Sequence, residues 1–293
     1  MNKWLEKHFG VSLGYLFICL VVLIFTIVCF YPFLYVVAMS FSSTNAILSG
    51  KVVLFPVEFQ LTAYEEILKK KQIWDSIGVT IQSTLFGTAL SLVLTILAAY
   101  SLSKKDLKGR KILAGLILFT MYFGGGIIPT LLVVKGVGLY DTVASLYIPN
   151  AVSVFNFIVI RTFFRELPPD LEEAAFLDGA NHLQILSRVV MPLSKPIIAT
   201  IGLFYAVGYW NDYFSALLYI QDPTKYSLQL RLRSLLFTEE LNTIGAGDMA
   251  GTPVMAESLK MASIVVGTIP IILIYPWLQK YFVKGVMLGS VKG

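Results

Sequence analysis

Charged residues are scarce in this chain: Asp, Glu, Lys and Arg make up 14% of its 293 residues, against 56% for hydrophobic residues. A soluble domain carries about 25% charged residues, most of them on its surface. The deficit means that much of the outer face of this protein does not meet water. An ordinary soluble enzyme and a disordered chain are therefore excluded, and an integral membrane protein is indicated.

Cysteine and histidine are also rare, with two residues of each. Cys19 and Cys29 lie in one apolar run, where a helix would separate them by about 15 Å, too far for a disulfide. No CxxC, HExxH or Ser/His/Asp arrangement occurs, so we predict neither a metal site nor a catalytic site. A GxxxxGKS or GxxxxGKT loop is missing as well, which excludes ATP hydrolysis by this chain. We therefore expect no enzyme activity and no cofactor in this chain.

Long runs without charge indicate where the chain crosses the membrane. A helix needs about 20 apolar residues to span the hydrocarbon layer, and lipid offers no partner for an open sheet edge. A charge at bilayer depth costs about 2.5 to 3.5 kcal/mol on insertion scales, so charged residues mark the ends of the spans. The pattern predicts an all-α integral membrane fold with six transmembrane helices. The predicted spans are residues 13–39, 77–102, 112–134, 142–162, 197–220 and 261–280.

The distribution of Lys and Arg predicts the orientation. If residues 1–12 are a cytoplasmic N-terminus, the inner segments hold fourteen of the 23 basic residues and the outer segments hold nine. Residues 13–285 then form the transmembrane domain and 286–293 a cytoplasmic tail. We explain the basic clusters as topology anchors beside membrane lipid, and we expect no nucleic acid partner.

Two local patterns fall outside this scheme. Three consecutive glycines at 124–126 lack the preceding strand and the following lysine of a phosphate loop. They predict close helix packing or a local break near Pro129. In the outer segment after the first span, residues 64–72 have the pattern of a short amphipathic helix.

The inner segment before the fifth span, residues 165–196, carries the most specific pattern. A pair of prolines ends the preceding helix, and Asp170 is expected to cap a short helix with Glu173 at its third position. Ala174 and Ala175 give this helix a flat surface that another protein can approach closely. We predict a short helix that docks on a partner.

A turn and a second helix follow in the same segment. Gly179 permits a sharp turn and is expected to have a positive φ. Asn181 is expected to cap a helix that runs through Val190, with Gln184 at its third position. Pro192 and Pro196 should stop this helix before the fifth span.

Residues 173–180 read EAAFLDGA and, with the VVMP stretch at 189–192, resemble the EAA loop of permease subunits in binding-protein-dependent ABC importers. More narrowly, the chain is similar to the carbohydrate-uptake branch of the maltose-transporter type, a likeness that the stretches at 128–142, 210–223 and 285–293 support. The resemblance implies the type I ABC importer permease fold, with an EAA loop at 165–196 that transmits motion from the ATPases. The residues that it assigns to this coupling are Glu172, Glu173, Ala174, Ala175, Asp178, Gly179, Ala180 and Pro192.

The resemblance also implies partners and a location. The partners are a second homologous permease subunit, two ATPase subunits that bind ATP and Mg, an extracytoplasmic solute-binding protein and a saccharide substrate. The chain is then a multi-pass protein of the bacterial cytoplasmic (inner) membrane. The tail residues that it places against the ATPases are Gly289, Ser290, Val291, Lys292 and Gly293.

The fifth predicted span changes from lipid-like to mixed near its middle. An intramembrane carboxylate is costly, so Asp212 is expected to face a cavity or a partner. Aromatic rings stack on the C–H faces of sugars, and Asn and Asp accept hydrogen bonds from sugar hydroxyls. These side chains either line a saccharide path or pack against the neighbouring permease subunit, and the sequence leaves both readings open. The candidate path residues are Tyr205, Tyr209, Trp210, Asn211, Asp212, Tyr213, Asn150 and Asn156.

We therefore expect a permease subunit that translocates an oligosaccharide, powered by separate ATPase subunits. A complex or acidic saccharide, such as an alginate or pectin fragment, is the narrower expectation, because Lys225, Arg231 and Arg233 on the outer side favour an acidic chain. The alternatives are an ABC importer for a non-sugar solute such as a peptide or polyamine, and a membrane scaffold that transports nothing.

Overall fold

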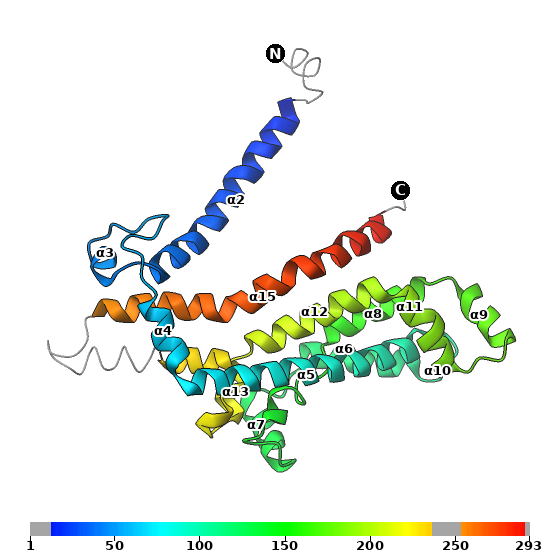
Figure 1. The fold of residues 1–293 in the computed structure, drawn as a ribbon. Helices are drawn as coiled ribbons and strands as arrows, with labels where there is room; N and C mark the ends of the chain where they lie inside the picture. Colours follow the sequence, from blue (N-terminus) through cyan, green and yellow to red (C-terminus); the bar gives the residue numbers. More distant parts are fainter. Residues whose placement is uncertain (1–12, 236–252, 291–293) are drawn as a thin grey trace. The chain divides into compact units, whose positions relative to one another are not determined.

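The structure, a computed structural model, describes residues 13–235 and 253–290 and contains helices and loops but no strand within these ranges (Figure 1). It separates into two compact units, which are described one at a time. The predicted cytoplasmic N-terminus, 1–12, and the tail residues Val291, Lys292 and Gly293 lie outside the described residues. The first unit comprises Met1–Lys70 with Ser234–Thr268, and the second comprises Lys71–Arg233 with Ile269–Gly293.

The first unit is built around a long apolar helix, α2 (Leu13–Ser40), whose side chains from Gly14 to Phe33 are almost all exposed. A helix that is apolar all round requires an apolar solvent, so this one suits lipid. The predicted helix at 64–72 is present as α4 (Thr62–Lys69), which buries Ala63 and Ile67. The other elements of this unit are α3 (Thr44–Leu48) and the first part of α15 (Pro253–Ser290).

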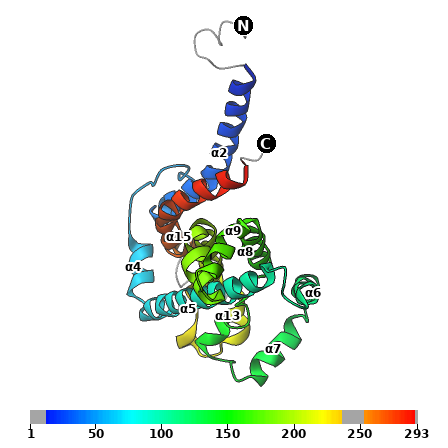
Figure 2. The ribbon, with the colours of Figure 1, turned by 90° about the vertical axis from the view of Figure 1, so that its right-hand side faces the viewer.

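Three helices form the centre of the second unit: α5 (Lys71–Ser103), α8 (Val154–Glu166) and α12 (Lys195–Asn211). They lie side by side in Figures 1 and 2 and share a core that includes Ile96, Phe157, Ile160 and Ile201. The remaining elements of this unit are α6 (Arg110–Tyr122), α7 (Ile127–Gly136), η1 (Val143–Leu146), α9 (Pro169–Leu177), α10 (His182–Ile185), η2 (Leu186–Val190), α11 (Met191–Leu193), α13 (Phe214–Tyr219), η3 (Pro223–Lys225), most of a helix whose described part is 228–235, and the end of α15.

One face of α5 is small and polar, and it packs against α12. Ser91 and Thr95 place their hydroxyls 2.8 and 2.7 Å from tyrosine hydroxyls of α12. Gly87 lies so close to Tyr209 that an added Cβ would stand 2.8 Å from its ring. Because serine, threonine and glycine recur here at helical spacing, the two helices approach closely and still satisfy their polar groups.

Residues 112–134 do not form the single helix that the sequence predicts. α6 ends at Tyr122 and α7 begins at Ile127, and the two are bent by 117°. Gly126 adopts a φ of 87°, a conformation that glycine adopts without steric cost. Of the two readings of the triple glycine, the structure shows the local break.

Residues 142–162 also differ from a continuous helix, because α8 begins only at Val154. The non-helical backbone before it is satisfied by α12: the N–H of Ser153 donates to the Tyr205 hydroxyl at 3.0 Å. The Tyr209 hydroxyl lies 3.3 Å from the carbonyl oxygens of Tyr147 and Asn150. Irregular backbone at membrane depth is tolerated where protein groups satisfy it, and here two tyrosines do so.

Three helices of the described chain are long and apolar enough to cross a membrane alone: Gly14–Ser40, Lys71–Ser103 and Glu257–Ile274. Two bent pairs, Arg110–Tyr122 with Ile127–Gly136 and His182–Leu193 with Lys195–Asn211, pass the same criterion together. The count of six spans and their orientation stay predictions.

Candidate functional site

A cavity of about 440 Å³ opens between α8, α12 and the irregular segment before α8. Five of the eight predicted path residues line it, and they come from segments about 50 residues apart in sequence. Trp210, Asn211 and Tyr213 do not line it. The lining residues are Asn150, Ser153, Phe155, Asn156, Phe204, Tyr205, Gly208, Tyr209 and Asp212.

The two cavity tyrosines have committed hydroxyls and largely buried rings. Tyr205 is hydrogen-bonded to Thr95 and to the backbone of Ser153, and Tyr209 to Ser91. Their rings are stacked, with centroids 6.5 Å apart and an interplanar angle of 19°. Because the hydroxyls are occupied in holding the chain together, these residues can offer a ligand only the small exposed part of each ring.

The two carboxylate oxygens of Asp212 have different surroundings. Its Oδ1 accepts a hydrogen bond from the N–H of Ser215 at 3.0 Å, which satisfies a donor at the start of α13. The side chain of Asn150 donates to Ser215 Oγ at 3.3 Å, so both polar residues border the break between α12 and α13. Asp212 Oδ2 has no hydrogen-bond partner in the described part of the chain and is available to a ligand hydroxyl.

The other three predicted path residues have different surroundings. Tyr213 packs in the cluster around Leu146 and Ala216, and the guanidinium of Arg233 lies 4.4 Å from its ring centroid. Asn211 is exposed and Trp210 half-buried, both outside the lining. The structure thus separates a cavity-facing set from its neighbours, a division that helical spacing alone did not predict.

A charged cluster on the predicted outer side was not predicted from the sequence. Asp141, with φ of 57°, accepts hydrogen bonds at Oδ1 from the N–H groups of Gln221 and Asp222, both at 3.0 Å. Lys225 Nζ lies 3.1 Å from Asp141 Oδ2 and 3.6 Å from Asp222 Oδ2. The hydrogen bond from Asp222 and then that from Lys225 hold the pKa of the Asp141 carboxyl below its usual value. The cluster joins the segment after α7 to the segment after α13.

The basic residues that were expected to favour an acidic saccharide have contacts inside the chain. Lys225 belongs to the Asp141 cluster. Arg231 donates to Ser76 Oγ at 3.4 Å and to the carbonyl oxygen of Pro223, and Arg233 lies over a tyrosine ring. They stabilise the predicted outer end of this unit.

The predicted coupling loop forms a turn between two helices, as expected, with one correction at its start. α9 begins at Pro169 with Pro168 as its N-cap, so the prediction that Asp170 caps it is wrong. Proline suits the first helical position because that residue needs no N–H partner, and Asp170 lies in the first turn instead. Gly179 has the predicted positive φ, 81°.

The second helix of the loop starts as predicted and continues differently. Asn181 and Gln184 form a reciprocal capping box, at 2.9 and 2.8 Å, which confirms the predicted cap. The α-helix gives way to a π turn, η2, and then to α11, so the helical run passes Pro192 and ends before Pro196. Proline cannot donate to the helical ladder, and the π turn ends just before it. The run ends at Ser194 and bends by 86° into α12.

The predicted coupling residues divide into two groups by exposure. Glu172, Ala175 and Ala180 are half-buried, and the two alanines pack against the core of the second unit. Glu172 forms an ion pair with Lys104, whose ammonium lies 4.1 Å from the ring centroid of Tyr100. The others face outward: Glu173, Ala174, Asp178, Gly179 and Pro192.

Gly289 and Ser290 of the predicted tail belong to the end of α15, before the limit of the described residues. In the described ranges, no group of three or more His, Cys, Asp or Glu side chains could hold a metal ion.

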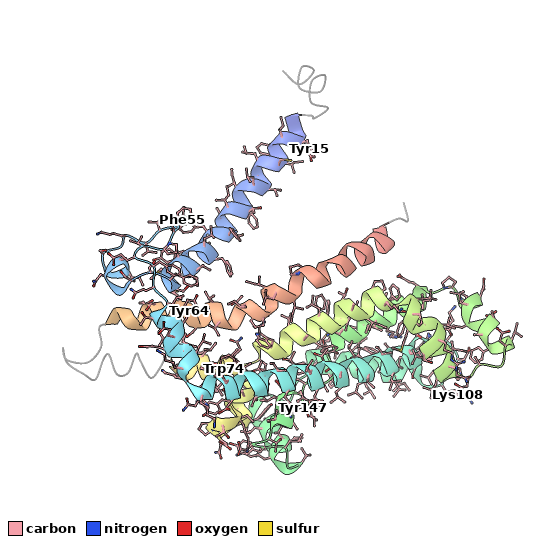
Figure 3. All side chains as sticks on the ribbon, viewed as in Figure 1. Tyr15, Phe55, Tyr64, Trp74, Lys108 and Tyr147 are labelled. Atoms are coloured by element: carbon pink, nitrogen blue, oxygen red, sulfur yellow. The ribbon has the colours of Figure 1, made fainter. Side chains whose placement is uncertain are left out.

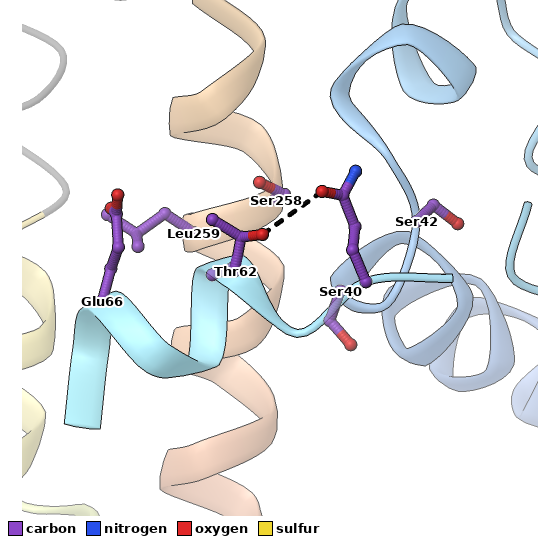
Figure 4. Close-up of a pocket in the computed structure, with 8 residues that line it drawn as sticks. Ser40, Ser42, Thr62, Glu66, Ser258 and Leu259 are labelled. Carbon is purple, nitrogen blue, oxygen red and sulfur yellow. Dashed lines mark hydrogen bonds between the residues drawn. The ribbon is translucent and has the colours of Figure 1, made fainter. Parts of the chain in front are cut away.

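A smaller cavity of about 50 Å³ lies in the first unit (Figure 4). The end of α2, α4 and α15 contribute to it, and Thr62 Oγ1 donates to Gln60 Oε1 at 3.2 Å within it. Since a water molecule occupies about 30 Å³, this volume is too small for a sugar. Its lining residues are Ser40, Ser42, Gln60, Thr62, Ala63, Glu66, Ser258 and Leu259.

Comparison with known proteins identifies the family. Residues 91–288 match the model of the binding-protein-dependent transport system inner membrane component. The polygalacturonan/rhamnogalacturonan transport system permease protein YtcP of Bacillus subtilis is 46% identical over 275 residues, covering 92% of this chain and 95% of that protein. Protein LplC of Bacillus subtilis is 45% identical, with 89% of each chain covered.

A solved structure agrees with these relatives. A chain of a bacterial ABC transporter involved in the import of the acidic polysaccharide alginate is 36% identical, with a TM-score of 0.82 over 94% of this chain and 97% of that one. The chain belongs to the family of binding-protein-dependent transport system inner membrane components. It is a permease subunit and not an enzyme, and the resemblance and the all-α permease fold expected from its sequence are confirmed.

Proposed function

We propose that this subunit forms one side of the translocation path for an oligosaccharide, with acidic oligosaccharides among its substrates. The observation that carries the proposal is the cavity bordered by Tyr205, Tyr209, Asn150 and Asp212 beside two helix breaks. Stacked rings suit the C–H faces of sugars, and the amide and carboxylate suit their hydroxyls. The relatives that import polygalacturonan, rhamnogalacturonan and alginate support acidic saccharides.

The lining also suggests how the work is divided between subunits. The cavity residues include one carboxylate and no Lys or Arg. This chain therefore offers ring faces and hydroxyl acceptors, and the carboxylates of an acidic sugar would be neutralised by the second permease subunit.

The proposed assembly contains that second, homologous permease, two ATPase subunits that hold ATP and Mg, and an extracytoplasmic binding protein. The exposed side of α9 and the tail at 289–293 would contact the ATPases on the cytoplasmic side. Closure of the ATPase pair would move α9, and the spans would alternate between inward and outward access as rigid bodies.

The test uses the assembled complex in proteoliposomes with its binding protein. We expect oligogalacturonides to stimulate ATP hydrolysis and to be taken up, whereas peptides and polyamines do neither. Stimulation by a peptide or polyamine alone would overturn the saccharide proposal. A chain that recruits no ATPase activity would point to the scaffold alternative.

Variants connect this test to the cavity. Asp212→Asn keeps the oxygen that accepts from the N–H of Ser215 and removes the charge, and Asn150→Ala removes an amide from the lining. We expect each to raise the saccharide concentration for half-maximal stimulation about tenfold at normal complex yield. Asn211→Ala, one residue away and outside the lining, is the matched control. Equal effects of all three substitutions would show that the cavity is not part of the translocation path.

A further inference from the structure

Three arginines of the second unit gather where α5 ends and α6 begins. Arg161 Nε donates to the carbonyl oxygen of Leu102 at 3.0 Å, and Arg110 Nη1 donates to that of Lys104 at 3.2 Å. The two acceptors are two residues apart, so both guanidinium groups are held at the same end of α5. Arg165 follows Arg161 by one helical turn on α8 and shares its face. In Figure 3, Lys108 of the connecting loop lies at this end, far from Trp74 at the start of α5.

The positive charge of this arginine cluster, Arg110, Arg161 and Arg165, is not balanced within the described chain. None of the three forms an ion pair there, and the nearby ion pair of Glu172 is with Lys104. The helix-end carbonyls supply only about half an elementary charge. The cluster therefore has the capacity to bind an anion as well as to anchor the topology.

An apolar surface continues directly from the cluster along α6. Ile112, Leu113 and Leu116 have 71%, 46% and 58% of their surface exposed. α6 belongs to one of the bent pairs that are apolar enough to enter a membrane. A ligand that fits both surfaces carries a phosphate beside the arginines and acyl chains along α6.

We propose that Arg110, Arg161 and Arg165 bind the phosphate of an anionic phospholipid of the cytoplasmic leaflet, with its acyl chains against α6. The site lies next to the Lys104–Glu172 ion pair, so a bound lipid fixes the end of α5 that holds α9. The inference rests on the proposed orientation of the permease and not on its substrate, and saccharide uptake measured separately distinguishes the two.

The experiment measures lipid retained by the purified complex, using native mass spectrometry with phosphatidylglycerol and phosphatidylcholine. We expect phosphatidylglycerol to be retained preferentially and Arg165→Gln to weaken its binding about fivefold. Arg165 is exposed and has no hydrogen bond within the described chain, so its replacement should not disturb folding. Arg165→Lys should retain most of the binding, and Arg188→Gln, at an exposed arginine outside the cluster, should retain all of it.

Four outcomes would overturn the proposal. Equal retention of both lipids, or no effect of Arg165→Gln, would leave the arginines as topology anchors only. Displacement of the retained phosphatidylglycerol by millimolar inorganic phosphate would identify a site for a free anion. Weaker association of the ATPase subunits in lipid-free detergent, caused by Arg165→Gln, would identify a protein contact instead.

Discussion

At the scale of single residues, the tyrosines of α12 explain how a broken helix is stable inside a membrane protein. Tyr205 and Tyr209 are 5% and 7% exposed, and their hydroxyls satisfy α5 on one side and the irregular segment before α8 on the other. The cavity exists because that segment is not helical. The aromatic residues that suggested a sugar path thus also build the space in which a sugar would lie.

The first prediction concerns the Tyr205 hydroxyl. Tyr205→Phe keeps the ring in the cavity but leaves the N–H of Ser153 and the hydroxyl of Thr95 without their partner. An unsatisfied buried donor costs about 1 to 3 kcal/mol, so the unfolding temperature of the complex should fall. Tyr213→Phe is the control, because no hydrogen bond to that hydroxyl occurs in the described chain. An unchanged unfolding temperature for Tyr205→Phe would contradict the structural role of the hydroxyl.

The second prediction concerns the Asp141 cluster on the predicted outer side. The hydrogen bond from the N–H of Asp222 is the main reason that the pKa of Asp141 lies below its ordinary value of 3.8. A carboxyl with a lowered pKa stabilises the fold above its unfolded pKa, and that contribution is lost as pH falls through the folded pKa. The pKa of Lys225 is raised above 10.5, chiefly by its hydrogen bond to Asp141, so the contribution of Lys225 is lost only as pH rises through that higher value.

Asp141→Asn tests this linkage, because asparagine tolerates the left-handed backbone that Asp141 adopts. We expect the variant to unfold at a lower temperature than the unmodified complex at pH 7 and at pH 5. The difference should shrink as pH falls below about 4, where first the unfolded and then the native carboxyl becomes protonated. A difference that is constant from pH 7 to pH 3 would show that the carboxylate charge contributes nothing.

At the scale of elements, the sequence predicted where helices occur better than where they break. Asn181 and Gln184 are close in sequence, so their capping box was visible in the pattern, and the positive φ of Gly179 followed from the type of residue. The late start of α8 depends on tyrosine hydroxyls about 50 residues away, which no local pattern encodes. The inward direction of Glu172 and the outward direction of Glu173 likewise depend on Lys104, 68 residues earlier.

The third prediction concerns the turn between α9 and α10. No atom lies within 4 Å of a Cβ added at Gly179, so the cost of a side chain there is backbone strain and not a clash. For a residue other than glycine that strain is about 1 to 2 kcal/mol, enough to tilt α9 without unfolding the unit. We expect Gly179→Val to leave complex yield unchanged and to reduce saccharide-stimulated ATP hydrolysis by about tenfold or more.

Gly115→Val is the matched control for that variant. Gly115 lies on the exposed side of α6, and an added Cβ there also meets no atom within 4 Å. Its backbone is that of an ordinary helix, so the substitution adds volume without the strain of a positive φ. Normal saccharide-stimulated ATP hydrolysis in Gly179→Val would show that the turn has no part in coupling.

The fourth prediction concerns the ion pair between Lys104 and Glu172, which ties the end of α5 to α9. The two side chains are 25% and 18% exposed, so the pair is worth more than a surface ion pair, on the order of 1 to 2 kcal/mol. Lys104→Glu should uncouple ATP hydrolysis from transport, measured as saccharide taken up for each ATP hydrolysed. Adding Glu172→Lys should restore the ratio, and failure of this exchange would show that the pair is incidental.

At the scale of the whole molecule, composition predicted a membrane protein and one short segment predicted its family. Both conclusions hold because each rests on a strong constraint. Contact with lipid requires a sequence with few charges, and docking on a partner requires a helix, a glycine turn and a cap. The number of spans is harder to derive. A bent pair such as α6 and α7 has the composition of one span and the geometry of two helices.

The last prediction tests the orientation directly. Cys19 and Cys29 are free and exposed on the apolar helix α2, so replacing both with alanine gives a background without thiols. In that background Glu66→Cys, in the predicted outer segment, should react in whole cells with a thiol reagent that cannot cross the membrane. Lys105→Cys, an exposed position in the loop between α5 and α6, should react only after the cells are opened, because the loop belongs to the predicted inner side, which is richer in Lys and Arg. Reaction of Lys105→Cys in intact cells would show that the orientation is the opposite of the predicted one. The same result would place α9 on the side opposite the ATPases, so it would also remove the coupling role assigned to Gly179 and Glu172.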